Sequence, residues 1–145
     1  MRKTLFSEAG DECDSEFEVD VANNLIVRNV SYIWKPDPLP FHRKVRAGFC
    51  LDCDSDNVRK GALYSPDLYL VLSDRYVELK GGTFQAEDRG RLAELVRSGQ
   101  TISFLFAQNR KLFAGKTKKT KYGDWADRLK CPWAVGRVIP QEWCE

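Results

Sequence analysis

The amino-acid sequence predicts a single α/β domain, because strand signals and helix signals alternate along its 145 residues. Two short apolar runs at residues 68–72 and 76–79, separated by a polar turn, indicate a β-hairpin. Residues 101–107 form an almost continuous apolar run, which is typical of a buried central strand. Residues 15–23 and 84–97 have apolar side chains at helical spacing. This length suffices for one hydrophobic core, so we expect one domain over residues 1–145.

The remaining segments are weaker in pattern. Residues 25–34 are rich in strand-forming side chains, and residues 35–40 are expected to be an extended proline segment. Residues 111–113 are expected to form a short strand, followed by a lysine-rich loop and a helix over residues 122–129. Residues 43–60 have no clear pattern. The four tryptophans are expected to anchor the core or an interface.

The composition is that of a globular protein, with 43% hydrophobic and 30% charged residues. No apolar run approaches the length of a membrane span, so we expect no membrane partner. The first residues lack the apolar segment of a secretory signal, and five cysteines are more consistent with free thiols than with a disulfide framework. We therefore expect a cytoplasmic location.

Charge is distributed unevenly, although the formal net charge is only +2. Seven acidic residues lie between positions 8 and 20, and eight basic residues lie between positions 110 and 130. A basic cluster of this kind attracts polyanions, and the alternative is a surface that only maintains solubility.

Two acid- or cysteine-rich patterns are compatible with metal binding but incomplete. Cys50 and Cys53 have the spacing of half a zinc site, which Cys131 and Cys144 could complete; the alternative is ordinary reduced cysteines in a loop. Asp52, Asp54 and Asp56 imitate the start of a calcium loop. That match fails, because Asn57 replaces the glycine and Leu63 replaces the closing glutamate.

The predicted hairpin contains the candidate metal-binding and catalytic residues. Side chains alternate along a strand, so Glu78 and Lys80 share one face while Val77 and Leu79 share the other. Asp67 follows Pro66 at the start of the first strand, and pairing around the turn returns Glu78 close to it. Two carboxylates beside a lysine suit Mg²⁺ or Mn²⁺. The alternative is a solvated ion pair between Glu78 and Lys80.

Several segments form a recognisable set of motifs: residues 15–18, Trp34 with Lys35, YSPDLYL at 64–70, VELKGG at 77–82, TISFLFAQNRKLFAG at 101–115, Tyr122 with Gly123, and VIPQEW at 138–143. Through these segments the sequence resembles the phage T7 endonuclease I family, the Holliday junction resolvases within the PD-(D/E)xK nuclease superfamily. The segment at 138–143 carries no chemistry, so its similarity points to kinship. Residues 42–63 are longer than the corresponding connection of the family and have no assigned function.

The resemblance implies a restriction-endonuclease-like αβββαβ core, a mixed central sheet flanked by helices, in an intertwined, domain-swapped homodimer. It assigns Asp67 and Glu78 as metal ligands, Lys80 as the catalytic lysine and Glu18 as a further ligand, with Mg²⁺ as cofactor and Mn²⁺ as a substitute. By analogy, Glu18 of one chain serves the hairpin of the other. The pattern of residues 15–23 alone favours exposure of Glu18 to water, and Glu16 and Asp20 are alternatives in another helix register.

The implied function is a metal-dependent, structure-selective DNA endonuclease that resolves four-way junctions and branched DNA in the cytoplasm of an infected bacterium. Backbone phosphates are expected to be contacted by basic side chains, since no major-groove helix is recognisable. The candidates are Arg89, Arg110, Lys116, Lys118, Lys119 and Lys121. Two alternatives stay open: another nuclease of the superfamily, of the restriction or transposon-end type, and a module that binds branched DNA without cutting.

Overall fold

The computed structural model describes residues 3–44, 59–113 and 119–145. The helices are α1 (Glu16–Val27), α2 (Ala86–Arg97), α3 (Tyr122–Arg128) and α4 (Gln141–Cys144). The strands are β1 (Leu5–Phe6), β2 (Glu12–Cys13), β3 (Tyr32–Trp34), β4 (Leu39–Lys44), β5 (Arg59–Tyr64), β6 (Leu68–Leu70), β7 (Arg75–Lys80), β8 (Ile102–Phe106) and β9 (Trp133–Val135). None of the helices in these described segments is long and apolar enough to span a membrane.

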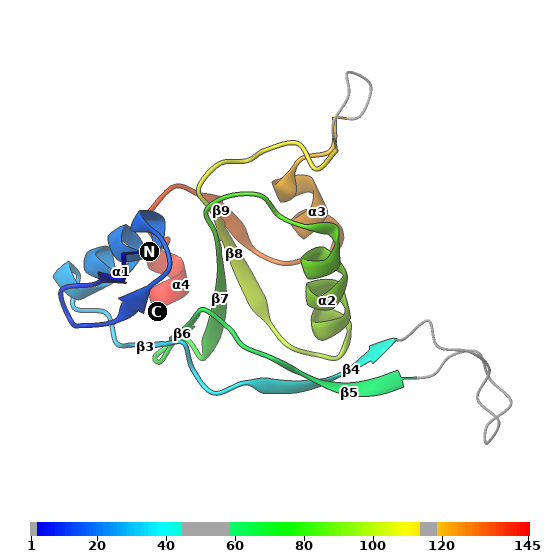
Figure 1. Cartoon of the computed structure of the whole chain (residues 1–145), viewed down its shortest axis with the longest axis horizontal. Coiled ribbons are helices and arrows are strands. Elements are labelled where there is room, and N and C mark those ends of the chain that lie inside the picture. Colours follow the sequence, from blue (N-terminus) through cyan, green and yellow to red (C-terminus); the bar gives the residue numbers. More distant parts are fainter. Residues whose placement is uncertain (1–2, 45–58, 114–118) are drawn as a thin grey trace, which may run out of the picture.

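A five-stranded mixed sheet with the order β3-β6-β7-β8-β9 forms the centre (Figure 1). β3, β6 and β7 pair antiparallel, whereas β7, β8 and β9 pair parallel. The helix α2 makes the crossover between β7 and β8, as parallel neighbours require. The expectation of an α/β fold is confirmed. With the β4–β5 hairpin set aside, the elements from α1 to β8 follow the order α-β-β-β-α-β.

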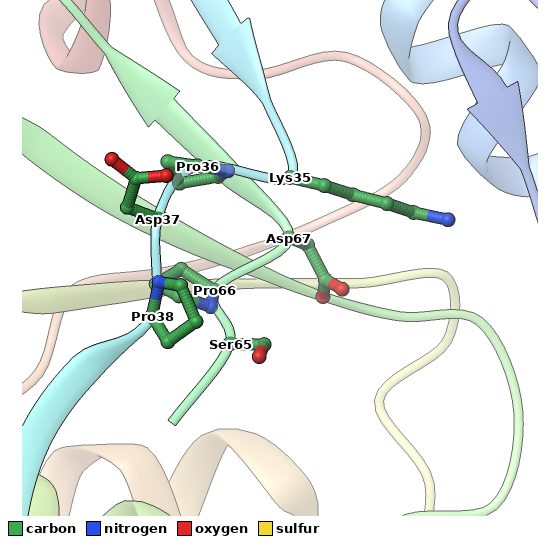
Figure 2. A pocket seen from close by; sticks show the side chains of 7 residues that line it. All are labelled: Lys35, Pro36, Asp37, Pro38, Ser65, Pro66 and Asp67. Carbon is green, nitrogen blue, oxygen red and sulfur yellow. The ribbon is translucent and has the colours of Figure 1, made fainter. Parts of the chain in front are cut away.

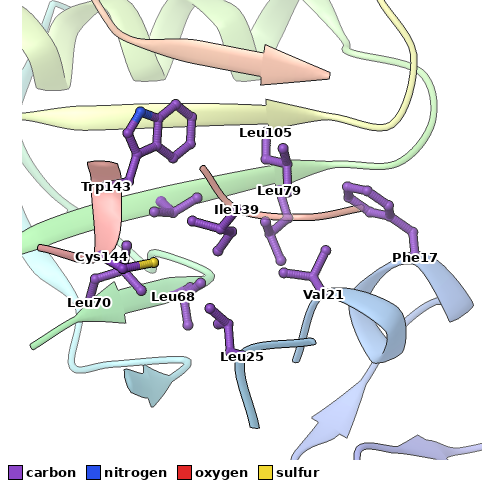
Figure 3. Close-up of a cluster of buried hydrophobic side chains, with 11 residues drawn as sticks. Phe17, Val21, Leu25, Leu68, Leu70, Leu79, Leu105, Ile139, Trp143 and Cys144 are labelled. Atoms are coloured by element: carbon purple, nitrogen blue, oxygen red, sulfur yellow. The ribbon is translucent and has the colours of Figure 1, made fainter. Parts of the chain in front are cut away.

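One face of the sheet is covered by α1 and α4. Ser15 caps α1 by accepting the Glu18 N–H with its hydroxyl at 3.3 Å. Phe17, Val21 and Leu25 then recur every fourth residue and form a buried stripe. Figure 3 shows this stripe pointing at side chains of β6 and β7 and at the C-terminal segment. The helix is thus fixed on the sheet by apolar packing.

The other face is covered by α2 and α3 (Figure 1). Phe104 and Phe106 of β8 project to this side and contact Phe84, whose ring centroid lies 6.5 Å and 6.1 Å from theirs. Leu105 projects to the α1 side instead. All five residues of β8 are buried because helices cover both faces, as the apolar run at residues 101–107 predicts.

The other predicted elements had mixed outcomes. The hairpin at residues 68–79 and the helices within 15–23, 84–97 and 122–129 are confirmed. The strand prediction for residues 25–34 was wrong over its first half, because α1 continues to Val27 and Leu25 completes its buried stripe. The strand prediction for residues 111–113 was also wrong, since only a single bridge links Lys111 to Lys121.

The hairpin of β4 and β5 had no sequence prediction. Six residues of each strand pair antiparallel from Leu39↔Tyr64 to Lys44↔Arg59, apart from the central sheet. Phe41 of β4 is buried in the core on the α2 side. Figure 1 shows the hairpin leaving the sheet beyond β3 and running along that side of the molecule. Residues 50–56, with the CxxC and the three aspartates, lie outside the described residues.

Cys131 and Cys144 do not lie together, so they cannot jointly complete a zinc site with Cys50 and Cys53. Cys144 is buried in the core beneath α1 and α4, and Cys131 is buried in the core beneath α2 and α3. The central sheet separates the two cores, so both thiols cannot reach one tetrahedral ion. Burial raises the pKa of Cys131 to about 11, which keeps it a neutral thiol.

Gly123 is a glycine that packing requires. It lies in α3, and a Cβ added there would be 2.5 Å from the Trp133 ring. The ring is held in place because its Nε1–H donates to Asp127 Oδ1 at 2.8 Å. Gly90 is the matched case in α2, with no atom within 4 Å of an added Cβ.

We expect Gly123→Ala to destabilise the protein by about 1–3 kcal/mol through overpacking. Gly90→Ala is expected to stabilise it by about 0.5–1 kcal/mol, since alanine favours an exposed helix position. Urea unfolding of both variants and the wild type measures the difference. Equal stability of the two variants would contradict the packing of α3 against Trp133.

Candidate active site

β6 and β7 separate at Asp67. Their ladder ends at the Leu68↔Val77 pair. Beyond it, the Asp67 carboxylate accepts the Leu79 N–H at 2.8 Å, so a side chain takes the place of a backbone carbonyl. The Asp67 backbone carbonyl accepts the Lys35 N–H at 2.9 Å. Asp67 is thereby fixed from both sides at the point where the strands part.

Glu78 and Lys80 lie on β7, on the face that carries α2. Their side chains form an ion pair, with Nζ and Oε1 3.0 Å apart and side-chain exposures of 17% for Lys80 and 7% for Glu78. The Lys80 ammonium also lies 5.3 Å from the centre of the Phe84 ring. Glu78 Oε2 is buried and has no hydrogen-bond partner in the described part of the chain. Glu78 and Lys80 therefore share one face, as the alternation of β7 predicts; they form the ion pair of the alternative interpretation, but that pair is buried rather than solvated.

Burial has the largest effect on the pKa of both hairpin acids, Asp67 and Glu78. It raises the pKa of Asp67 to about 6, against the Leu79 N–H and the Lys80 charge, which lower it. Burial likewise raises the pKa of Glu78 to about 7, against the charge and hydrogen bond of Lys80. For Lys80, burial lowers the pKa, but the Glu78 and Asp67 carboxylates outweigh it and the net pKa is raised. Lys80 is thus a cation wherever the carboxylates are charged.

Glu18 lies in the first turn of α1 and is only 8% exposed. Its carboxylate accepts the Asp14 N–H, and its charge contributes to raising the pKa of Asp67, although less than burial does. Glu16 and Asp20 are exposed, and Asp20 pairs with Arg137. The pattern-based prediction that Glu18 faces water was wrong, because Glu18 is buried and its carboxylate turns back to the Asp14 N–H before the helix.

A pocket of about 390 Å³ opens beside Asp67. It is lined by Lys35, Pro36, Asp37, Pro38, Ser65, Pro66 and Asp67. Figure 2 shows the Asp67 carboxylate and the Lys35 side chain on the same side, with Asp37 turned the opposite way. Asp67 can therefore be reached by a ligand in this pocket.

The hairpin places two carboxylates, Asp67 and Glu78, in the electrostatic surroundings of Lys80. No group of three His, Cys, Asp or Glu side chains is gathered around a possible metal position among residues 3–44, 59–113 and 119–145. Mg²⁺, however, commonly takes one or two carboxylates and completes its shell with water and substrate phosphate. The unpaired Glu78 Oε2 is a buried acceptor without a donor, and Asp67 borders the open pocket. These two acids are therefore the candidates that a metal-binding proposal has to consider.

The basic side chains predicted to contact phosphates differ in their surroundings. Arg89 makes contacts within the protein: its guanidinium donates to the Phe84 carbonyl and lies 5.8 Å from the Phe113 ring. Arg110, Lys119 and Lys121 are exposed. Lys116 and Lys118 lie outside the described residues. The basic segment begins beside the candidate site, since the Ala107 N–H donates to the Lys80 carbonyl at 2.9 Å.

Sequence reasoning missed two neighbours of the hairpin acids. Asp88 of α2 raises the pKa of Glu78 and Lys80 through its charge, and it pairs with Arg91 at 2.5 Å. Lys35 joins the wall of the pocket. The i,i+3 spacing of Asp88 and Arg91 indicates a helix-surface pair, but no sequence signal shows that this surface faces β7.

Neither protein-family models nor curated protein sequences give a match to this chain.

The raised pKa values predict how stability depends on pH without metal. The folded state binds more protons than the unfolded state between about pH 4 and pH 8, so the free energy of unfolding falls as pH rises. Asp67→Asn keeps an oxygen acceptor for the Leu79 N–H but cannot ionise. We expect its stability relative to wild type to increase by on the order of 2 kcal/mol from pH 4 to pH 8.

Denaturant unfolding in EDTA at several pH values measures this slope. Asp37→Asn, an exposed acid of the same pocket, serves as the control and is expected to follow the wild type. An Asp67→Asn profile parallel to the wild-type profile would contradict the burial of a charged Asp67.

Proposed function

We propose that the protein is a metal-dependent DNA endonuclease that hydrolyses phosphodiester bonds in branched DNA, four-way junctions above all. The observation that carries the proposal is the grouping of Asp67, Glu78 and Lys80 where β6 and β7 separate, with an unpaired buried oxygen on Glu78. A buried acceptor without a donor is costly for a purely structural role. The order of the elements from α1 to β8 and the quoted sequence motifs support the same proposal.

Asp67 and Glu78 are the residues proposed to hold Mg²⁺, or Mn²⁺ in its place. When bound, such an ion polarises the scissile phosphate and lowers the pKa of a water molecule. The protein supplies the carboxylates already fixed, Asp67 by the Leu79 N–H and Glu78 by Lys80. Little reorganisation is then needed when the ion and the substrate phosphate bind together.

Lys80 and Glu18 complete the proposed site. The Lys80 ammonium is held as a cation beside Glu78 and can donate to a phosphate oxygen as negative charge develops on it, or orient the attacking water. Glu18 adds a third negative charge next to Asp67. That charge favours cation binding at the site and disfavours the approach of a bare phosphate.

Selectivity for branched DNA is proposed to come from the placement of phosphate contacts. Arg110, Lys119 and Lys121 are exposed on the segment that leaves β8 beside Lys80. Charges in such a segment contact the backbone and carry no base sequence information. The DNA shape then decides which phosphate reaches the hairpin.

A homodimer is part of the proposal, because two sites in one particle can cut two strands of a junction in one encounter. Within the single chain, α1 packs on its own sheet and brings Glu18 next to Asp67. In the intertwined arrangement that the sequence motifs suggest, α1 of one chain makes the same contacts with the sheet of the other. Each site then combines Glu18 of one protomer with the hairpin of its partner.

Cleavage of a labelled four-way junction and of a linear duplex with the same arms, in Mg²⁺, tests the proposal. We expect paired cuts in the junction and much slower cutting of the duplex. Glu78→Ala and Lys80→Ala are expected to lower the cleavage rate by on the order of 100-fold or more. Glu142→Ala and Arg97→Ala, which change an exposed acid and an exposed base outside the site and outside the basic cluster at residues 110–130, serve as controls.

Two results would contradict the proposal in different ways. Equal cutting of the junction and the duplex would indicate another kind of nuclease with the same site. Junction binding without cutting, in the wild type and in both variants alike, would indicate a binding module.

A further inference from the structure

The pocket beside Asp67 has a positive side chain that the proposed reaction does not use. We propose that this pocket binds the sugar-phosphate backbone of the DNA strand next to the cleaved bond, and that Lys35 is its phosphate-binding residue. This inference rests on the proposed function and adds a substrate contact to the same site. Its ligand class is a nucleic acid phosphodiester.

Lys35 is tied to Asp67 through the backbone. The Lys35 N–H donates to the Asp67 carbonyl at 2.9 Å, directly after the Trp34↔Leu68 pair of β3 and β6. The position of Lys35 therefore follows that of Asp67, independently of any flexible loop. A phosphate near Lys35 is consequently held at a fixed offset from the carboxylate.

The backbone of Lys35 is in an unusual conformation. Its φ is +47°, in the left-handed region that side chains other than glycine seldom adopt. Such a conformation costs about 1 kcal/mol or more and persists where the surroundings impose it. Here it turns the chain into Pro36 and sends the Lys35 side chain to the side of the pocket where the Asp67 carboxylate lies (Figure 2). The strain thus has the effect of placing a cation beside the site.

Lys35 can exchange its present ion-pair partner for an anionic ligand. Its ion-pair partner Asp14 lies at 3.5 Å, and the two side chains are 43% and 70% exposed. A surface pair of this length contributes little, so a phosphate can replace the carboxylate at small cost. Asp37, the other acid of the pocket, is turned the opposite way in Figure 2 and does not repel an anion there.

The residues that line the pocket hold its shape before a ligand binds. Pro36, Pro38 and Pro66 restrict the backbone on both sides, and Ser65 adds a hydroxyl. A volume of about 390 Å³ falls within the range of about 300–1,000 Å³ that is usual for ligand pockets. A lysine at the edge of such a pocket acts as a point charge for a phosphate.

The test is junction binding in EDTA, where no metal-dependent cleavage occurs, measured by fluorescence anisotropy from 50 to 200 mM salt. We expect Lys35→Ala to weaken binding about tenfold at the lower salt and to reduce the slope of log affinity against log salt by about 0.9 for each Lys35 engaged. Lys35→Arg is expected to restore both quantities, because it keeps the charge. Competition with inorganic phosphate at the same ionic strength is expected to have little effect, since a free phosphate lacks the neighbouring backbone contacts.

Arg97→Ala is the control. Arg97 is also an exposed cation, in the last turn of α2, and it lies outside both the pocket and the basic cluster at residues 110–130. Wild-type affinity and slope are expected for this variant. If Lys35→Ala behaves like Arg97→Ala while the wild type binds and cuts the junction, this inference is wrong and the proposed function stands. Efficient competition by inorganic phosphate would show a general anion site and overturn the assignment to a DNA strand, whereas a wild type that neither binds nor cuts DNA would overturn both.

Discussion

Where β6 and β7 part, the Asp67 carboxylate accepts the Leu79 N–H in place of a backbone carbonyl. This bond ends the ladder without leaving a donor unpaired, and it fixes a carboxylate at the end of two strands. Pro66 precedes it and has no N–H of its own to continue the pairing. Asp67 also lines the pocket beside Lys35, so the residue that ends the ladder is part of the pocket wall as well.

Alternate residues of β7 belong to the core and to the candidate site. Val77 and Leu79 anchor β7 in the core beneath α1, which forces Glu78 and Lys80 onto the opposite face. The start of α1 also approaches the end of β7 closely, since a Cβ at Gly81 would lie 3.0 Å from the Phe17 ring. Glu18 follows Phe17 directly, so the packing that seats the helix also places the acid. Folding energy from apolar burial therefore supports carboxylates that are themselves costly to bury.

The sequence predicts the parts of the fold that local pattern controls. The alternation of β7, the apolar run of β8 and the spacing of α2 are each complete within a few residues. The burial of Glu18 was not predictable from the pattern of its helix, because Glu18 lies one position off the apolar stripe and is buried only by the tertiary packing of that helix. Lys35 was missed because its neighbour Asp67 is reached only through the pairing of β3 with β6. Tertiary packing of α1 decides the first position, and pairing of distant strands decides the second.

The central claim is that Asp67 and Glu78 together hold a divalent cation. Calorimetric titration of Mn²⁺ into the protein without DNA measures this directly, with Glu78→Gln and the exposed Glu142→Gln as the compared variants. We expect the wild type and Glu142→Gln to bind the ion with release of protons near pH 6, because binding ionises acids with raised pKa values. We expect at least tenfold weaker binding by Glu78→Gln. Equal binding by all three proteins, or no binding by any, would contradict the claim.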